Sequence, residues 1–437
     1  MSTEHVVELR RDLHAHPERG WCEFRTSSIV AERLAELGFD VAVGPDVVDP
    51  TTEARRPGPE ELERAAERAV GEGADPDLVD RMAGGLTGVV GTLEHGDGPT
   101  VGFRVDMDAL PVEEADDGHL PANEGFQSTH AGEMHACGHD GHTAIGLGLA
   151  ERVASDEGFD GTLKLFFQPA EEGLGGGRAM ASGGHLDDMD ALVAVHLGLG
   201  IPTGTVVSGV EFLTAGSMEV TFTGRSAHAA AAPEEGASAL HAAASATCAI
   251  QAIPRHSEGM TRVNVGRLDA GTASNVIPER AVMEVETRGE SDALYEYARE
   301  RATRAIEGAA HTHGVEVEIE QRARAISVPH RPAFAERVAA VVSGTEDVEH
   351  VESHRLVSGS EDACFLLRRV REHGGEATYA IVGADLAGPH HAGTFDFDER
   401  ALGIGVDTLA RVARDVAANG VHEERREGES RAGGHTV

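Results

Sequence analysis

The sequence predicts an α/β fold in which a larger domain, a mixed sheet flanked by helices, is interrupted by a smaller one. Three observations support this prediction. The length of 437 residues exceeds what one hydrophobic core usually supports. β-rich runs alternate with helical stretches over most of the chain. Between about residues 209 and 321 that pattern changes to the order βαββαβ, which is typical of a ferredoxin-like module.

Two amphipathic helices are expected near the N-terminus, over residues 6–13 and 26–37. In the second, apolar residues recur at helical spacing, and Gly38 suits the position where such a helix stops. Residues 45–85 then form an insertion rich in Glu and Arg, with one expected helix over residues 60–70 and a second short one. We assign no chemistry to this insertion.

The sheet of the larger domain is expected from five β-rich runs, with a helix at 142–154 between two of them. The runs are residues 87–93, 100–105, 162–167, 191–195 and 377–382. Asp106 and Asp108 follow one run, Glu171 and Glu172 follow another, and His196 ends a third. Open α/β sheets bind ligands at the carboxyl ends of their strands, so we expect these side chains to meet there.

The inserted domain is read from six elements in the order strand, helix, strand, strand, helix, strand. They are expected at residues 217–223, 236–253, 261–268, 280–287, 291–311 and 315–320. This insertion, residues 209–321, divides the larger domain into residues 1–208 and 322–437.

The charge balance limits the possible partners. The chain carries 37 Lys and Arg residues against 75 Asp and Glu residues, a formal net charge of −38. No basic patch could follow a phosphate backbone, so we expect no nucleic-acid partner. Self-repulsion of this size opposes compaction unless salt screens it. The charge therefore indicates a halophilic protein in a salty cytoplasm, the alternative being a merely acidic surface.

The sequence also predicts a cytoplasmic protein without a membrane association. The N-terminus lacks the apolar core of a signal peptide, and no run reaches the roughly 18 apolar residues of a membrane span. The four cysteines are widely spaced, which argues against a disulfide framework and suits a reducing compartment.

The most concentrated chemistry lies at residues 134–142, Met-His-Ala-Cys-Gly-His-Asp-Gly-His, with Gln-Pro-Ala-Glu-Glu following at 168–172. A thiolate and imidazoles suit zinc, cobalt or manganese better than magnesium or calcium, which prefer oxygen alone. Cys137 alone would more often be a buried apolar residue. One residue away from His139, it is better explained as a metal ligand, and a metal-dependent enzyme is the leading hypothesis.

Six motifs extend this hypothesis over residues 11–399. They read GWCEFRT at 20–26, FRVDMDAL at 103–110, MHACGHDGHTAIGLGLA at 134–150, FQPAEEG at 167–173, RVNVG at 262–266 and FDFDE at 395–399. As a set they resemble the M20 family of metallopeptidases and amidohydrolases, in its aminoacylase-like branch with a cysteine ligand. The resemblance implies a metallohydrolase domain with an inserted lid and dimerisation domain.

The resemblance also implies a site with two divalent metal ions, Mn or Zn, with Co or Ni also acceptable. The residues that match the family's ligands are Cys137, His139, Glu172, His196 and His391. His390 competes with His391, which is favoured because it stands four residues before Phe395. Asp108 is placed in the catalytic site, where it orients a ligating imidazole or else caps the structure after its strand.

Glu171 is implied as the general base and acid. It takes a proton from the attacking water and returns it to the departing amine. Adjacency alone does not rank Glu171 and Glu172, so this order rests on the resemblance.

Three residues of the inserted domain match lid positions of the family. His228 is expected to stabilise the oxyanion, often in the active site of a partner subunit. Asn275 and Arg288 are expected to bind the carboxylate of the substrate. The resemblance therefore implies a homodimer, or a pair with a homologous second subunit, and a closing motion.

The expected reaction is hydrolysis of the amide bond of a small N-acyl amino acid. An N-aroyl amino acid such as p-aminobenzoyl-glutamate is the leading substrate, and hippurate-like, auxin-conjugate-like or dipeptide substrates are the alternatives. A different alternative is a catalytically silent partner subunit, which would have no physical need to keep Glu171 beside all the ligands.

Overall fold

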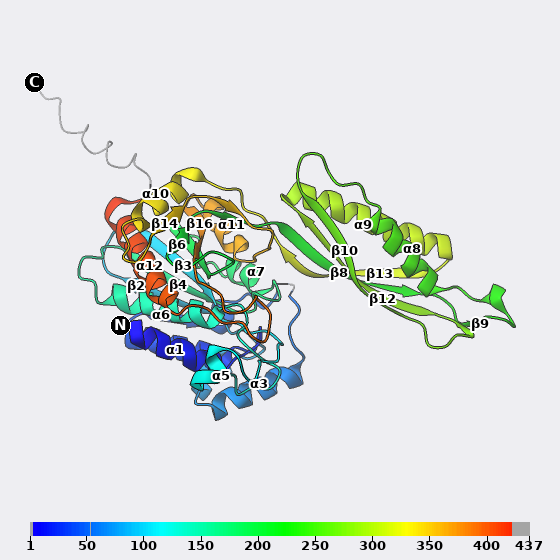
Figure 1. Cartoon of the computed structure of the whole chain (residues 1–437), viewed down its shortest axis with the longest axis horizontal. Helices are drawn as coiled ribbons and strands as arrows, with labels where there is room; N and C mark the ends of the chain where they lie inside the picture. The colour runs from blue at the N-terminus through cyan, green and yellow to red at the C-terminus, as the bar shows by residue number, and fades with distance from the viewer. Residues whose placement is uncertain (1–2, 53, 422–437) are drawn as a thin grey trace, which may run out of the picture. The chain divides into compact units, whose positions relative to one another are not determined.

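The computed structural model describes residues 3–52 and 54–421 (Figure 1). Contacts between residues divide the chain into two compact units. Unit 1 comprises Met1–Glu211, Val328–Leu356 and Ala363–Val437, and unit 2 comprises Phe212–Ser327 and Val357–Asp362.

The boundaries differ from the expected residues 209 and 321. Unit 2 ends later because its last strand runs on to Ala325, across an irregularity between Gln321 and Ala323. The return of Val357–Asp362 to unit 2 is a long-range contact that no local pattern indicates.

Unit 1 contains most of the helices and the larger sheet. Its elements, in chain order, are α1 (Thr3–Ala15), α2 (Phe24–Glu36), β1 (Asp40–Val43), η1 (Gly44–Asp46), α3 (Pro59–Gly71), α4 (Pro76–Arg81), β2 (Val89–Glu94), β3 (Thr100–Asp106), α5 (Leu120–Glu124), α6 (His139–Ala154), β4 (Thr162–Gln168), α7 (Gly176–Ala181), β5 (Ala191–Leu197), β6 (Thr205–Val207), β7 (Val210–Glu211), α10 (Pro332–Val342), β14 (His350–Glu352), β15 (Arg355–Leu356), α11 (Cys364–Glu372), β16 (Glu376–Val382) and α12 (Arg400–Asn419).

The larger sheet has eight strands in the order β1-β2-β4-β3-β5-β16-β6-β14. β4, β3, β5 and β16 run parallel, whereas β1 with β2, β2 with β4 and β16 with β6 are antiparallel. The expected mixed sheet is therefore confirmed. All seven residues of β5 are buried, as in a strand covered on both faces. The carboxyl ends of the four parallel strands share one edge.

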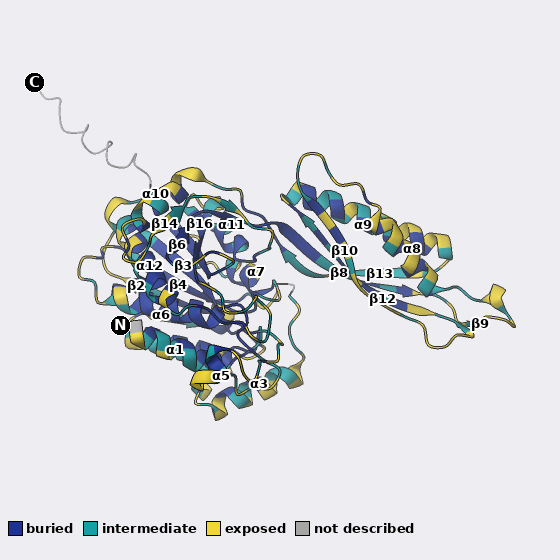
Figure 2. Ribbon diagram, viewed as in Figure 1, coloured by how far each residue is buried: buried dark blue, intermediate teal, exposed yellow. Residues whose placement is uncertain are grey.

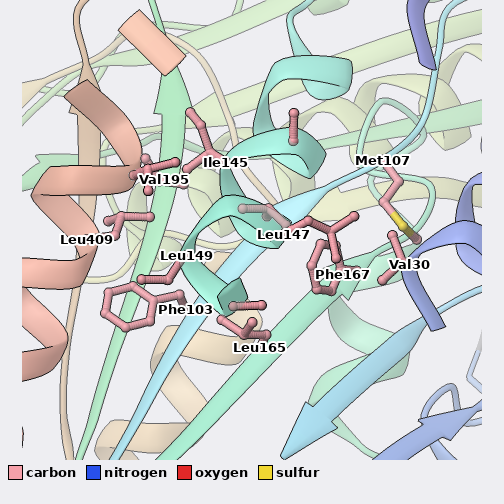
Figure 3. Packing of buried hydrophobic residues seen from close by; sticks show 14 of the residues in the cluster. Val30, Phe103, Met107, Ile145, Leu147, Leu149, Leu165, Phe167, Val195 and Leu409 are labelled. Carbon is pink, nitrogen blue, oxygen red and sulfur yellow. The ribbon is translucent and has the colours of Figure 1, made fainter. Parts of the chain in front are cut away.

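α6 forms the centre of the core beside this sheet. Its residues from His139 to Ala150 are buried, and Leu147 and Leu149 pack with Phe103 and Phe167 (Figures 2 and 3). α1 and α12 pack against α6 in turn.

α6 begins earlier than expected, at His139 instead of residue 142. Gly138 adopts a left-handed backbone with φ 97°, and its carbonyl accepts the N–H of His142 at 3.0 Å. This early start matters because it places His139 in the first turn of a fully buried helix.

Unit 2 is an antiparallel sheet with two helices on one face. Its elements are β8 (Thr214–Thr223), β9 (Ala227–His228), η2 (Pro233–Glu235), α8 (Ala239–Gln251), β10 (Thr261–Ala270), β11 (Val276–Ile277), β12 (Arg280–Gly289), α9 (Asp292–His313) and β13 (Glu316–Ala325). The strand order β10-β12-β8-β13 and the βαββαβ sequence are those of a ferredoxin-like fold, as expected. Burial alternates along β8 and β12, because α8 and α9 cover only one face.

Two further features of the described residues bear on the expectations. None of the helices combines the length and the apolarity that crossing a bilayer requires. The four cysteines are all unpaired.

Candidate metal centre

Two candidate ligands sit on either side of a glycine in a left-handed conformation. Cys137 and His139 flank Gly138, whose φ of 97° lies in the region that glycine adopts freely. The chain turns sharply there into α6, and the Cys137 and His139 ligand atoms come within 4.8 Å of each other and of His196 in β5.

The other two candidate ligands come from loops at the same edge of the sheet. Glu172 follows β4, and His391 lies in the loop after β16. His391 has φ 62°, unusual for a residue with a side chain, and its N–H donates to the carbonyl of Ala136 at 2.8 Å. This bond ties the His391 loop to the segment that carries Cys137.

The five predicted ligands gather into two overlapping groups within unit 1. In each group the ligand atoms lie within 4.8 Å of one another: Cys137, His139 and His196 form one, and Cys137, Glu172 and His391 form the other. Sγ of Cys137 is 3.5 Å from Nε2 of His196, and Nε2 of His391 is 3.4 Å from Oε2 of Glu172. Cys137 is the member that both groups share.

The imidazoles are oriented as metal ligands usually are. Nδ1 of His196 donates to the carbonyl of Leu197 at 2.6 Å, and Nδ1 of His139 lies 3.3 Å from Oδ1 of Asp108. In both rings Nε2 is left to face the group. A partner on the far nitrogen fixes the tautomer and the direction of the ligating one.

His142 satisfies the same distance condition, with Asp106 and His139, but its hydrogen bonds give it another role. Its Nδ1 contacts Oδ1 of Asp106, and its Nε2 accepts the N–H of Leu197 at 2.8 Å. Because both nitrogens are occupied, His142 supports the neighbouring rings and has no atom left for a metal.

His390 lies near the groups without joining them. Its ring centre is 6.1 Å from that of His196, and burial lowers its pKa to about 4. His391, in contrast, places Nε2 against Glu172. The geometry therefore favours His391 over its neighbour.

Two buried polar atoms at the centre have no hydrogen-bond partner among the described residues. They are Nε2 of His139 and Oε1 of Glu172, which are 3.9 Å apart. Burial also raises the pKa of the Cys137 thiol, raises that of Glu172 to about 7 and lowers that of His196. Each shift favours the neutral side chain. A divalent cation would satisfy the two unpartnered atoms and stabilise the anionic donors, so these residues fit a metal.

Asp108 connects the ligand loops. Its buried carboxylate accepts the N–H of Glu171 through Oδ1 and that of Glu172 through Oδ2, each at 3.0 Å, beside His139. The ligand atoms of Glu171, Glu172 and His139 lie within 4.8 Å of one another. Asp108 thus positions other residues of the centre.

Replacing Asp108 with Asn should lower kcat about 10- to 100-fold, as loss of an orienting partner does at metal sites. An amide offers one acceptor oxygen in place of two, so one N–H of the glutamate pair would be orphaned, costing about 1–3 kcal/mol of stability. Kinetics and chemical unfolding measure the two effects. Asp190→Asn is the matched control, because Asp190 accepts the N–H of Thr100 at the opposite edge of the sheet. An equal loss of kcat in both variants would contradict this role.

The structure places His228 and Asn275 beside each other in unit 2. His228 lies in β9, which pairs with β11, and the N–H of Ala229 donates to the carbonyl of Asn275 at 3.0 Å. The His228 side chain is exposed, and its Nδ1 accepts from the N–H groups of Ala230 and Ala231. Its Nε2 is the atom that remains for a substrate.

Arg288 is not beside this pair within unit 2. It lies near the end of β12, whereas Asn275 precedes the start of that strand. Its Nε and Nη2 bond to the carboxylate of Glu286 at 2.8 and 3.0 Å, and Nη1 bonds to the carbonyl of Ser358. One chain therefore does not bring Asn275 and Arg288 to a common carboxylate.

The sequence pattern did not single out Glu23, a buried residue that hydrogen-bonds to the turn before Glu171. Its only signal was membership of the motif at residues 20–26. Nothing in that spacing names its partner, which lies 147 positions away along the chain.

Comparison with known proteins agrees with this geometry. Residues 102–415 match peptidase family M20/M25/M40. One of the named subunits of p-aminobenzoyl-glutamate hydrolase from Escherichia coli (strain K12) is 48% identical over 412 residues, covering 92% of this chain and 94% of that protein. The indole-3-acetyl-aspartic acid hydrolase of Enterobacter agglomerans is 46% identical, covering 93% of this chain and 95% of that protein.

Solved structures show the same fold. The aminobenzoyl-glutamate utilization protein of Klebsiella pneumoniae has a TM-score of 0.80 at 40% identity, with 94% of this chain and 96% of that one covered. A Bacillus subtilis protein described as a dinuclear metal binding peptidase from the M20 family has a TM-score of 0.68 at 25% identity, with 95% and 98% covered.

Proposed function

The chain belongs to peptidase family M20/M25/M40, and from this we propose that it is a metal-dependent hydrolase of the amide bond in N-acyl amino acids. The observation that carries the proposal is the convergence of five ligand side chains on a shared cysteine, with Glu171 next to them. An N-aroyl-glutamate such as p-aminobenzoyl-glutamate is the leading substrate. A silent partner subunit is disfavoured, because it would not need Glu171 and the ligands together.

Two divalent ions fit the two overlapping groups, with Cys137 as the ligand common to both. The mixed sulfur, nitrogen and oxygen donors suit Mn or Zn, and also accept Co or Ni. The chemistry that such a pair supplies is polarisation of the amide carbonyl and a lowered pKa for water. The B. subtilis relative described as dinuclear supports this count.

Glu171 is the proposed proton carrier. Its backbone is fixed by Asp108 and by the N–H of Leu174, which donates to the Glu171 carbonyl at 2.7 Å. Its side chain is largely buried and lies with His139 and Glu172. A carboxylate held there can take the proton of the attacking water and pass it to the leaving amine.

The lid residues are proposed to act between two copies of the chain. His228 and Asn275 lie together, whereas Arg288 lies elsewhere in the same unit. A homodimer would let one copy supply His228 and Asn275 and the other supply Arg288. The name of the E. coli relative marks it as one subunit of its hydrolase, so a homologous second subunit is the alternative partner.

A cytoplasmic, salt-adapted enzyme is proposed from composition. The four unpaired cysteines suit a reducing compartment. The net charge of −38 favours folding where concentrated salt screens the repulsion.

Substrate preference should show an acidic amino acid on the departing side. The two relatives at 48% and 46% identity are named for acyl-glutamate and acyl-aspartate substrates. We expect kcat/KM for p-aminobenzoyl-glutamate to exceed that for N-benzoyl-glycine by at least about 10²-fold, because a site built for a second carboxylate is left unpaired by glycine. A panel of N-acyl amino acids, assayed in strong salt with added Mn²⁺ or Zn²⁺, tests this. A preference for N-benzoyl-glycine would favour the hippurate-like alternative.

A further inference from the structure

The turn that carries Glu171 and Glu172 is held by two buried carboxylates. Asp108 accepts the N–H groups of Glu171 and Glu172. Oε1 of Glu23 accepts the preceding N–H, that of Ala170, at 2.8 Å. Three successive backbone N–H groups therefore meet carboxylate oxygens, and the first of them depends on a residue with no assigned role.

Ala170 is the point at which this turn requires support. Its φ of 51° is a left-handed conformation that residues with a side chain adopt at a cost. Its carbonyl accepts the N–H groups of Gly175 and Gly176 at 3.2 and 3.3 Å. On the other side, a Cβ at Gly20 would come within 3.0 Å of the Ala170 Cα, so the chain packs closely there. Strain of this kind persists only where several contacts hold it.

We propose that Glu23 is a positioning residue for the general base, Glu171. Glu23 is 0% exposed, and its second oxygen, Oε2, bonds to the hydroxyl of Thr87 at 2.6 Å, so the carboxyl group is held on both sides. By fixing the N–H of Ala170, Glu23 sets the direction in which the chain enters Glu171. This inference rests on the proposed function, because it takes Glu171 as the base.

The electrostatics of Glu23 suggest a conservative variant. Burial, and then the charge of Asp108, raise the pKa of Glu23 to about 8. At neutral pH the carboxyl group is mainly protonated, and its carbonyl oxygen still accepts the Ala170 N–H. Glutamine has the same shape and the same acceptor, so Glu23→Gln should keep this bond, whereas Glu23→Ala removes it.

Glu18 provides a matched control. It is 1% exposed, and its oxygens accept the N–H groups of Arg25 and Thr26 at 2.9 and 2.8 Å. Burial raises its pKa to about 7. These bonds support the start of α2, away from Ala170. Glu18→Ala therefore removes a buried carboxyl group and its backbone bonds without loosening the glutamate turn.

The test compares Glu23→Ala, Glu23→Gln and Glu18→Ala in the full chain loaded with Co²⁺. For Glu23→Ala we expect kcat to fall about 10- to 100-fold, with KM and metal content little changed. We also expect a shift in the visible absorption of the cobalt, because the same turn carries the ligand Glu172. Glu23→Gln and Glu18→Ala should keep the wild-type kcat and spectrum, although Glu18→Ala should lower Tm as Glu23→Ala does.

Equal kcat values and cobalt spectra in Glu23→Ala and Glu18→Ala would overturn the proposal, because Glu23 would then support only the fold. If Glu23→Ala does not fold, Thr87→Val releases Oε2 alone and should lower kcat about 3- to 10-fold; an unchanged kcat there would likewise overturn it. If the wild-type chain hydrolyses no N-acyl amino acid, the proposed function fails, and the cobalt spectra still decide whether Glu23 positions the turn.

Discussion

Turnover should fall about 10²- to 10⁴-fold when Glu171 is replaced by Gln, while the protein keeps its full metal content. Glutamine has the shape of glutamate but takes up no proton at neutral pH, so both proton transfers lose their carrier. The ligand set of Cys137, His139, Glu172, His196 and His391 is unchanged by this substitution. Steady-state kinetics with p-aminobenzoyl-glutamate and elemental analysis of the same preparation measure the two quantities.

The adjacent Glu172→Gln variant is the natural control. Its carboxylate lies 3.4 Å from Nε2 of His391 and 3.9 Å from Nε2 of His139, as expected of a ligand. Glu172→Gln should therefore lose metal as well as activity. If Glu171→Gln lost metal and Glu172→Gln kept it, the two roles would have to be exchanged. Activity retained in Glu171→Gln would remove the general base from the mechanism.

Cys137→Ala is expected to abolish binding of both metal ions and with it all measurable hydrolysis. Cys137 belongs to both groups of candidate ligands, so its loss leaves each group with two donors. A protein thiolate is a strong ligand for Zn and Co, and the remaining histidines and Glu172 do not replace it. Metal content after dialysis against trace metal, together with kcat, tests this expectation.

Cys22→Ala controls for the removal of a buried thiol. Cys22 is 3% exposed, and burial raises its pKa to about 12, so it is a packed thiol without a metal partner. We expect this variant to keep both metals and wild-type kcat. A Cys137→Ala protein that still bound two equivalents of metal would show that the shared thiolate is not a ligand.

Parts of the site could be predicted because their information is local. The Cys137-Gly138-His139 segment brings two donors together through a single backbone turn, and the donor types alone exclude magnesium and calcium as first choices. The position of His196 at the end of an apolar strand was also readable, because strand ends in α/β sheets line ligand sites. The same applies to the βαββαβ pattern of unit 2.

Other parts could not be predicted because they depend on contacts between distant segments. The start of α6 at His139 follows from the left-handed backbone of Gly138, which propensity does not reveal. His142 shares the motif of the ligands, and only its bonds to Asp106 and Leu197 show that both its nitrogens are used. The separation of Asn275 from Arg288 required the strand register of unit 2.

Residue identity and short-range spacing were enough to establish the chemical character of this protein: the donor types, the paired glutamates, the two-part α/β organisation and the acidic composition. Folding does not alter these properties. The three-dimensional arrangement was needed to show which nitrogen of each histidine faces the centre, that Cys137 is shared by two groups, and that Asp108 and Glu23 hold the glutamate turn. Those facts arise where segments from different strands and loops meet, because hydrogen bonds act over about 3 Å in space and carry no signature along the chain.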